Sequence, residues 1–256
     1  METNVTVATI NIHGRNDRWL ERRHLLVAQL IESGADLISM QEINTPIRQA
    51  VWLCKQINVR LSGSDRVPYQ LVQKRYWRVL RGQSSGIGVL SRLPVIYSES
   101  MHLGYGGRIA LRAHVELPSH QTMDFVTTQL HQVPHEPEAR HQQMMKLMAW
   151  LHGHKRVPIQ VVAGDMSELP DGLAIKYIKQ SFRSAYETIY GREPLATYPT
   201  TLSGPVYGLG RCFDYIFIST AVHRVTSVRI FCDESASDDN TLYPSDHVGL
   251  LATLQV

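Results

Sequence analysis

Residues 212–219 read CFDYIFIS and residues 243–254 read YPSDHVGLLATL. Asp214 interrupts an apolar, strand-like run, where a carboxylate is costly unless it is paired. Its obvious partner is His247, which follows Asp246 just before the apolar run at the end of the chain. An Asp–His couple holds the imidazole in one tautomer and stabilises its charged form. The alternative is a buried aspartate that is bound by backbone N–H groups alone.

Other carboxylates occupy similar places in the sequence. Glu42 closes the segment LISMQE, Asp165 follows IQVVAG, and Asp246 precedes VGLLATL. Polar groups at strand ends are often part of an active site, because a rigid sheet positions them. Their hard oxygen atoms suit Mg²⁺ or Mn²⁺ and do not suit zinc. Each acid taken alone would more simply be a helix cap or a turn residue.

Strand-like and helix-like segments alternate along the chain. We predict strands over Val5–Asn11, Leu37–Met40, Gly86–Leu90, Val95–His102, Ile109–Glu116, Met123–Thr128, Ile159–Ala163, Cys212–Ile218 and Val248–Val256. We predict helices over Arg18–Ser33, from Pro46 through Cys54, and over Glu136–His152. The first helix places Leu20, Val27, Leu30 and Ile31 on one apolar face. The strands between residues 86 and 128 follow one another closely, which argues against a purely parallel layout and predicts mixed sheets with helices outside.

The composition is that of an ordinary globular protein. The 256 residues carry a net charge of +3, with 43% hydrophobic and 19% charged residues, which excludes disordered and collagen-like classes. No linker or repeat stands out, so we expect one domain over residues 1–256. The three cysteines form no CxxC pair, which excludes a zinc ribbon. The first residues do not resemble a signal peptide, and no apolar run approaches the ~20 residues of a membrane span, so we expect a cytoplasmic protein without a membrane span.

A serine-hydrolase motif is also present. Residues 82–86, GQSSG, match GxSxG, and Asp214 and His247 follow in a suitable order. That motif requires a helix directly after the serine. Here the strand-like IGVLSRLP follows, so we set the serine-hydrolase interpretation aside.

Eight weak segments occur in order between residues 7 and 254. They read VATINIHG, DLISMQE, SGIGVLSRLPV, DFVTTQLHQ, EARHQQ, VVAGDMSELPD, CFDYIFIS and YPSDHVGLLATL. The ordered set resembles the endonuclease/exonuclease/phosphatase superfamily, which includes DNase I, exonuclease III-type repair enzymes, neutral sphingomyelinases and inositol-phosphate phosphatases. The resemblance covers nearly the whole chain. It implies a DNase I-like, four-layer α/β sandwich of two packed mixed β-sheets flanked by helices, and divalent-metal-dependent cleavage of phosphoester bonds.

The resemblance implies a metal site for Mg²⁺ or Mn²⁺. Asn11 matches the asparagine that helps to hold the metal shell, and Glu42 matches the metal-binding glutamate of the QE motif. Asp246 matches the metal-site aspartate of the SDH motif.

It also implies catalytic roles. Asp165 matches the aspartate that positions or activates the attacking water. Asp214 matches the aspartate that orients the catalytic histidine, here His247, which acts as a base or as a phosphate-binding acid.

Two positions depart from the family's pattern. Gln129 stands where the family usually has the histidine of a THL motif, and Ser167 stands where it has the asparagine of GDxN. Both side chains can donate a hydrogen bond, but neither can carry a positive charge. His131 lies two residues past Gln129 and would face the same side of an extended strand, where it could be an auxiliary group. The alternative is that His131 is a loop histidine.

These observations predict a Mg²⁺- or Mn²⁺-dependent phosphoric ester hydrolase that acts by in-line attack of water on a phosphodiester or phosphomonoester. The two departures could weaken its activity, and a weakened or inactive phosphate- or metal-binding pseudoenzyme is the alternative. We favour the hydrolase because the expected metal ligands and the Asp–His couple remain. The substrate stays undecided among a small molecule, a lipid headgroup and a nucleic acid, since the charge is modest. No protein partner can be inferred.

Overall fold

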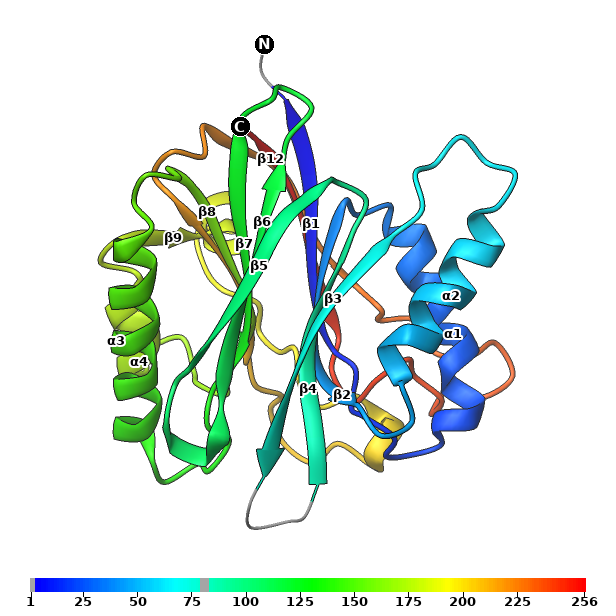
Figure 1. Ribbon diagram of the computed structural model, residues 1–256. Coiled ribbons are helices and arrows are strands. Elements are labelled where there is room, and N and C mark those ends of the chain that lie inside the picture. The colour runs from blue at the N-terminus through cyan, green and yellow to red at the C-terminus, as the bar shows by residue number, and fades with distance from the viewer. Residues whose placement is uncertain (1–2, 79–82) are drawn as a thin grey trace.

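The protein is described by a computed structural model of residues 3–78 and 83–256, whose strands form two packed, six-stranded sheets (Figure 1). In spatial order the first sheet contains β11 (Arg224–Phe231), β12 (Gly249–Gln255), β1 (Asn4–Asn11), β2 (Leu37–Asn44), β4 (Gln83–Ser91) and β3 (Gln70–Arg78). The second contains β5 (Val95–His102), β6 (Ile109–Glu116), β7 (Thr122–Gln129), β8 (Ile159–Asp165), β10 (Asp214–Ser219) and β9 (Phe182–Ser184). The pairs β1–β2 and β7–β8 are parallel, and the other described neighbours are antiparallel, so both sheets are mixed.

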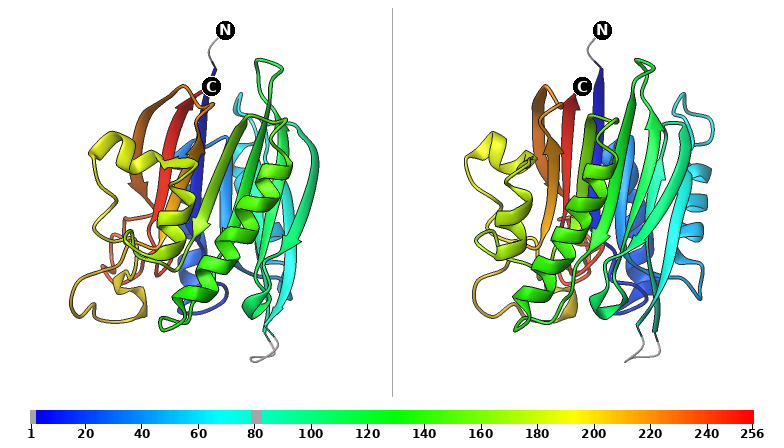
Figure 2. Two further views of the ribbon diagram at one scale, coloured as in Figure 1. Left: turned by 90° about the vertical axis from the view of Figure 1, so that its left-hand side faces the viewer. Right: turned by 60° about the vertical axis from the view of Figure 1, so that its left-hand side comes forward.

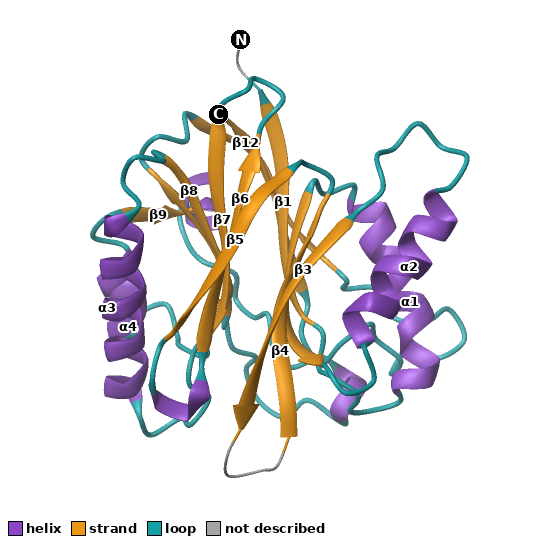
Figure 3. Ribbon diagram, viewed as in Figure 1, coloured by secondary structure: helices purple, strands orange, loops and turns teal. Residues whose placement is uncertain are grey.

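Helices cover the outer face of each sheet (Figures 2 and 3). The first sheet is covered by α1 (Trp19–Ser33) and α2 (Gln49–Leu61), and the second by α3 (Pro137–Gly153) and α4 (Leu173–Ile178). The short elements are α5 (Ala185–Tyr190) and two 3₁₀ turns, Tyr105–Gly107 and Thr201–Ser203. The order helix, sheet, sheet, helix confirms the predicted four-layer sandwich. Within the described residues, no helix is both long and apolar enough to cross a membrane.

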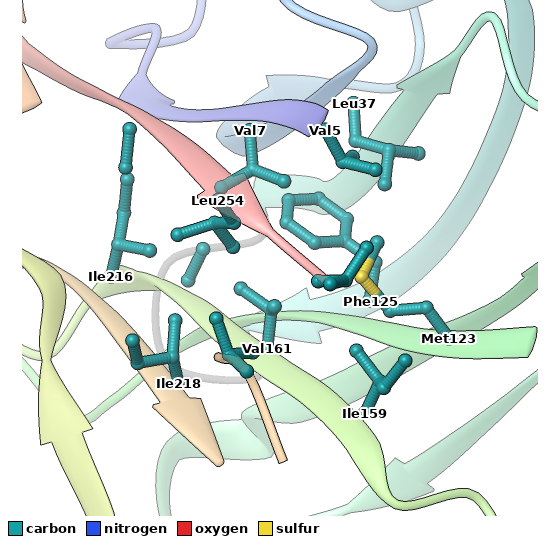
Figure 4. Close-up of a cluster of buried hydrophobic side chains, with 14 of the residues drawn as sticks. Val5, Val7, Leu37, Met123, Phe125, Ile159, Val161, Ile216, Ile218 and Leu254 are labelled. Carbon is teal, nitrogen blue, oxygen red and sulfur yellow. The ribbon is translucent and has the colours of Figure 1, made fainter. Parts of the chain in front are cut away.

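The alternation of side chains along each strand builds separate cores on the two faces of a sheet. In β1, Val5 and Val7 face the second sheet, whereas Ala8 and Ile10 face the helices. Figure 4 shows the core between the sheets, where Phe125 and Val161 meet Val7. Complete burial of one such side chain contributes about 1.5–3 kcal/mol, so this core holds the sheets together.

The inward-facing positions change from apolar to polar toward one end of the sandwich. In β1 the inward series continues from Val7 through Thr9 to Asn11, and the equivalent series in β7, β8 and β10 end at Gln129, Asp165 and Asp214. Between the apolar core and these residues, the Ser39 hydroxyl donates to Thr127 Oγ1 at 2.6 Å. Because side chains alternate between the two faces along each strand, these polar side chains lie together between the sheets. They lie at the end of the sandwich opposite both chain termini (Figure 1).

Several helix boundaries differ from those expected. Helix α1 begins at Trp19, after Arg18 adopts a left-handed backbone with φ 54°. Trp19 is buried and packs edge-on against Trp52, whereas Leu20 is 69% exposed, so its predicted place on the buried face was wrong. Helix α2 begins at Gln49 rather than Pro46, because Arg48 also has a left-handed backbone, and it continues to Leu61.

Strands β3, β9 and β11 were not predicted, because their sequences mix polar and apolar residues without a clear alternation. The serine of the GxSxG match, Ser84, lies within strand β4, and no helix follows it directly. The first glycine of that match, Gly82, lies outside the described residues.

Candidate active site

A cleft of about 980 Å³ opens at the polar end of the sandwich. Its lining includes His13, Glu42, Asp165, Ser167, Asp246 and His247. Glu42 and Asp165 lie near the ends of β2 and β8, and the others follow β1 or β8 or precede β12, so strand ends of both sheets set their positions.

Asp165 lies at the centre of the site and is almost completely buried. Its Oδ2 accepts hydrogen bonds from Asn11 Nδ2 at 3.1 Å and from Gln129 Nε2 at 2.9 Å. Its Oδ1 accepts from the backbone N–H of Ser167 at 2.8 Å and from the Ser167 hydroxyl at 3.0 Å. Since each oxygen accepts two hydrogen bonds, the neighbouring donors hold this carboxylate in one orientation.

Glu42 reaches the cleft through an irregular backbone. The pairing of β2 with β4 shifts register between Met40 and Ile43, and Glu42 has a left-handed φ of 57°. Such a bulge redirects a side chain. Glu42 Oε1 accepts from Gln129 Nε2 at 2.9 Å and from Gln132 Nε2. One amide group, that of Gln129, thus connects the carboxylates of Glu42 and Asp165 across the two sheets.

Asp214 and His247 form the predicted pair. His247 Nδ1 lies 2.8 Å from Asp214 Oδ2, and the Thr197 hydroxyl donates to the same oxygen at 2.6 Å. Burial alone would lower the pKa of His247, but Asp214, together with Asp246 and Asp165, outweighs this effect and raises the pKa to about 10. Burial also raises the pKa of the fully buried Asp214, while His247 opposes that rise. The surroundings therefore favour a charged imidazole at the cleft.

His13 is a site residue that the sequence reasoning missed. Its Nδ1 lies 3.0 Å from Asp246 Oδ2, and its Nε2 lies 2.8 Å from Asp17 Oδ2. Burial opposes the charged form, but Asp246 and Asp17 raise the pKa of His13 above its usual value. The available signal was the segment NIHG, in which His13 follows Asn11 by two residues.

Tyr198 was also missed. Its ring centroid lies 4.8 Å from that of His247 and 5.8 Å from that of Phe213. Burial and the negative charges of Asp246, Glu42 and Asp165 raise the pKa of its hydroxyl. Tyr198 therefore packs beside His247 in the cleft, close enough for the acids of the site to influence its hydroxyl.

Two buried arginines hold the loops that carry these groups. Arg22 Nη1 donates to the carbonyl oxygens of Ile12 at 3.0 Å and of Pro244 at 2.8 Å, and its Nη2 donates to that of Gly14 at 2.9 Å. Arg140 donates to Glu168 Oε2 at 2.7 Å and to the Val133 carbonyl at 2.7 Å. The first arginine joins the segment after β1 to the segment before Asp246, and the second joins the loops after β7 and β8.

The structure brings together all the residues expected in the site except His131. Strand β7 ends at Gln129, so the strand alternation used to place His131 does not extend to it. His131 Nε2 lies 2.8 Å from Glu136 Oε2, and its ring packs against Tyr105. His131 is absent from the described residues that line the cleft.

The donor set can be compared with the needs of a divalent cation. Glu42 and Asp246 supply carboxylate oxygens at the cleft. Mg²⁺ commonly uses one or two carboxylates and keeps several waters. Within residues 3–78 and 83–256, no group of three or more His, Cys, Asp or Glu side chains is placed so that it could hold a metal ion by itself. The residues present therefore fit an open Mg²⁺ or Mn²⁺ site and do not fit a closed structural site.

Comparisons with known proteins agree with this architecture. A model of the Endonuclease/Exonuclease/phosphatase family matches residues 8–247. A search of curated protein sequences finds no significant match. The structure of a truncated TDP2 from Caenorhabditis elegans is similar with a TM-score of 0.78 at 15% identity, over 99% of this chain and 98% of that one.

Two further solved structures have the same fold. The endonuclease/exonuclease/phosphatase from Bacteroides vulgatus gives a TM-score of 0.75 at 20% identity, over 99% of both chains. The human Nocturnin catalytic domain with bound sulfate anion gives 0.76 at 18% identity, over 100% of this chain and 97% of that one. At these identities the likeness concerns the fold.

Proposed function

This chain belongs to the Endonuclease/Exonuclease/phosphatase family, and we propose that it hydrolyses a phosphodiester or phosphomonoester by in-line attack of water in a Mg²⁺- or Mn²⁺-dependent reaction. The observation that carries the proposal is the meeting in one cleft of Asp165, Glu42 and His247, with Asp214 bound to His247 behind it. Structural ion pairs alone do not explain why Asp165, Glu42 and His247 line one cleft at the strand ends of both sheets.

Each residue has a role that follows from its contacts. Asp165 is fixed by Asn11, Gln129 and Ser167, so it can orient a water molecule with little reorganisation. His247 is held by Asp214 through Nδ1, which leaves Nε2 to donate a hydrogen bond to a phosphoryl or leaving-group oxygen. Glu42 and Asp246, with Asn11 nearby, would hold the cation. When bound, the cation would neutralise charge on the phosphoryl oxygens.

The two departures have a consistent explanation within this proposal. The amide nitrogen of Gln129 and the hydroxyl of Ser167 both donate to Asp165. They therefore act on the carboxylate that orients water. The competing proposal, a phosphate- or metal-binding protein without turnover, draws on the same contacts, because donors engaged within the protein do not reach a scissile phosphate.

Turnover separates the two proposals. The purified protein should hydrolyse bis(p-nitrophenyl) phosphate or p-nitrophenyl phosphate when Mg²⁺ or Mn²⁺ is present, and EDTA should stop the reaction. Asp165→Asn, purified in parallel, should lower kcat by about 10²–10⁴. Saturable binding of phosphate or Mn²⁺, with no release of nitrophenol from either substrate, would support the competing proposal of a binding protein without turnover.

The same assay can address the substrate. A panel of a nucleic acid, a choline phospholipid and a sugar phosphate covers the three classes left open by the sequence. Single-stranded DNA belongs in the panel because the similar TDP2 of D. rerio was solved with a single-strand DNA product.

A further inference from the structure

A buried arginine lies behind the site, outside the cleft. Arg108 immediately precedes β6 and is 3% exposed. Its Nη1 donates to the Tyr76 hydroxyl at 2.8 Å and to Oε1 of Gln129. The Tyr76 hydroxyl donates to the same Gln129 oxygen at 3.1 Å, and the guanidinium lies 5.6 Å from the centroid of the Tyr76 ring. Neither Arg108 nor Tyr76 is among the described residues that line the cleft.

This arrangement determines which way the Gln129 amide points. On one side the Arg108 guanidinium can only donate, and the Tyr76 hydroxyl, which accepts from Arg108, donates to the same amide oxygen. On the other side Glu42 and Asp165 require a donor. A reversed amide would set N–H groups against the guanidinium and oxygen against two carboxylates. Arg108 therefore fixes the orientation in which Gln129 donates to the catalytic acids.

The charge of Arg108 also needs an explanation. Within the described part of the chain, no carboxylate lies at ion-pair distance from this guanidinium, although a buried charge requires compensation. Its hydrogen bonds lead through Gln129 to Glu42 and Asp165. A charge-assisted bond to the amide oxygen polarises the amide and strengthens the bonds that its N–H groups donate.

We propose that Arg108 is a positioning residue that orients and polarises Gln129, and through it holds Asp165 and Glu42 in their working arrangement. This inference rests on the proposed hydrolase function. It assigns to Arg108 the positive charge that Gln129, standing in place of a histidine, cannot supply. Arg108 acts without touching the substrate, so its loss should affect turnover more than substrate binding.

The kinetic experiment uses Arg108→Met, which keeps length and apolar contact with Tyr76 but removes charge and donors. We expect kcat on bis(p-nitrophenyl) phosphate to fall by about 10- to 100-fold, as for other residues that orient a catalytic group. KM should change little. Arg108→Lys should recover part of the loss, because an ammonium group keeps the charge but cannot reproduce the planar fork.

A matched control is available at Arg92. Its guanidinium lies 5.1 Å from the centroid of the Tyr69 ring and its Nε donates to the Ala35 carbonyl at 3.0 Å, but it contacts no site residue. Arg92→Met should leave kcat unchanged. An equal loss of kcat in Arg92→Met and Arg108→Met would overturn the proposal, since general loosening of the fold would then explain both.

A second readout does not depend on turnover. The side-chain amide of Gln129, labelled with ¹⁵N and assigned with Gln129→Glu, should exchange its protons slowly in the wild type and faster in Arg108→Met. An unchanged amide signal together with an unchanged kcat would refute the positioning role. If the wild type shows no hydrolysis, the proposed function fails, and the amide signal alone decides whether Arg108 holds Gln129. If Arg108→Met does not fold, Arg108→Lys decides by the same two criteria.

Discussion

The substitution Asp214→Asn replaces one oxygen of a fully buried carboxylate by an NH₂ group and keeps the shape of the side chain. In the wild type, Asp214 Oδ2 accepts from His247 Nδ1 at 2.8 Å, and its negative charge keeps the imidazole protonated, so Nε2 also carries a proton. The amide of the variant is neutral, so His247 would lose the charge that keeps Nε2 protonated, although the amide oxygen can still accept from Nδ1 and from the Thr197 hydroxyl. The comparable Asp→Asn substitution in a catalytic Asp–His couple lowers kcat by about 10⁴. We expect a loss of about 10³–10⁴, or roughly 4–5.5 kcal/mol at the transition state.

The same substitution should destabilise the fold in a pH-dependent manner. Each tenfold change in proton affinity is worth about 1.4 kcal/mol, so raising the pKa of His247 from 6.5 to about 10 corresponds to roughly 4–5 kcal/mol. Asp214 makes the largest favourable contribution to that rise. Breaking a buried ion pair typically costs about 3–5 kcal/mol, which agrees with this magnitude.

The sign of the pH dependence follows from the raised pKa. A histidine with a raised pKa in the folded state stabilises the protein fully below the unfolded value of 6.5. That contribution is lost as the pH rises through about 10. The difference in unfolding free energy between wild type and Asp214→Asn should therefore shrink from pH 6.5 to pH 10, as measured by urea unfolding of the metal-free protein in EDTA.

A second buried Asp–His pair provides the control. Asp124 is fully buried and accepts from Arg112 Nη1 at 2.7 Å, and its Oδ1 lies 2.8 Å from His114 Nδ1, remote from the cleft lining. Asp124→Asn should lower stability but leave kcat unchanged. A folded Asp214→Asn variant with full activity, or an equal loss of kcat in Asp124→Asn, would refute the catalytic role of the Asp214–His247 pair.

Two further substitutions test the loops around Asp165. Ser167 has a left-handed φ of 48°, a conformation that asparagine tolerates better than serine. Ser167→Asn should therefore keep or raise the unfolding free energy and increase kcat, while a slower enzyme of equal stability would show that serine is the better residue here. Arg22→Met leaves the carbonyl oxygens of Ile12 and Pro244 without their buried donor. It should lower the unfolding free energy by at least about 3 kcal/mol in urea denaturation, and a loss below about 1 kcal/mol would contradict the role of Arg22 in holding the site loops.

The sequence predicted the parts of the site that depend on the period of a strand or on the cost of burying charge. Asp214 stood out because a carboxylate inside CFDYIFIS needs a partner, and the structure supplies His247. Asn11, Gln129 and Asp165 lie together because each ends an inward-facing series of residues in its own strand. The fold followed from the same alternation, together with the ordered motifs.

Other residues gave no such signal. His13 lies in a loop after β1, where no periodicity relates a residue to its neighbours in space. Arg108 precedes a strand, and its sequence context does not distinguish it from an ordinary surface arginine. Only the fold shows that it is buried and bonded to Gln129. His131 was placed by alternation beyond the end of β7, where the rule no longer holds. The positions of all three residues depend on tertiary contacts between segments that are distant in the sequence.

Activation by Mn²⁺ tests the central claim most directly. The initial rate of bis(p-nitrophenyl) phosphate hydrolysis is titrated with Mn²⁺ for the wild type and for Glu42→Gln, which keeps an oxygen acceptor for Gln129 Nε2 but removes the charge. We predict a saturable rise in the wild type and a Mn²⁺ requirement at least about tenfold higher in the variant, equivalent to about 1.4 kcal/mol of cation binding. A rate that does not depend on the metal, or an identical Mn²⁺ dependence in both proteins, would contradict the claim that Glu42 holds a catalytic cation.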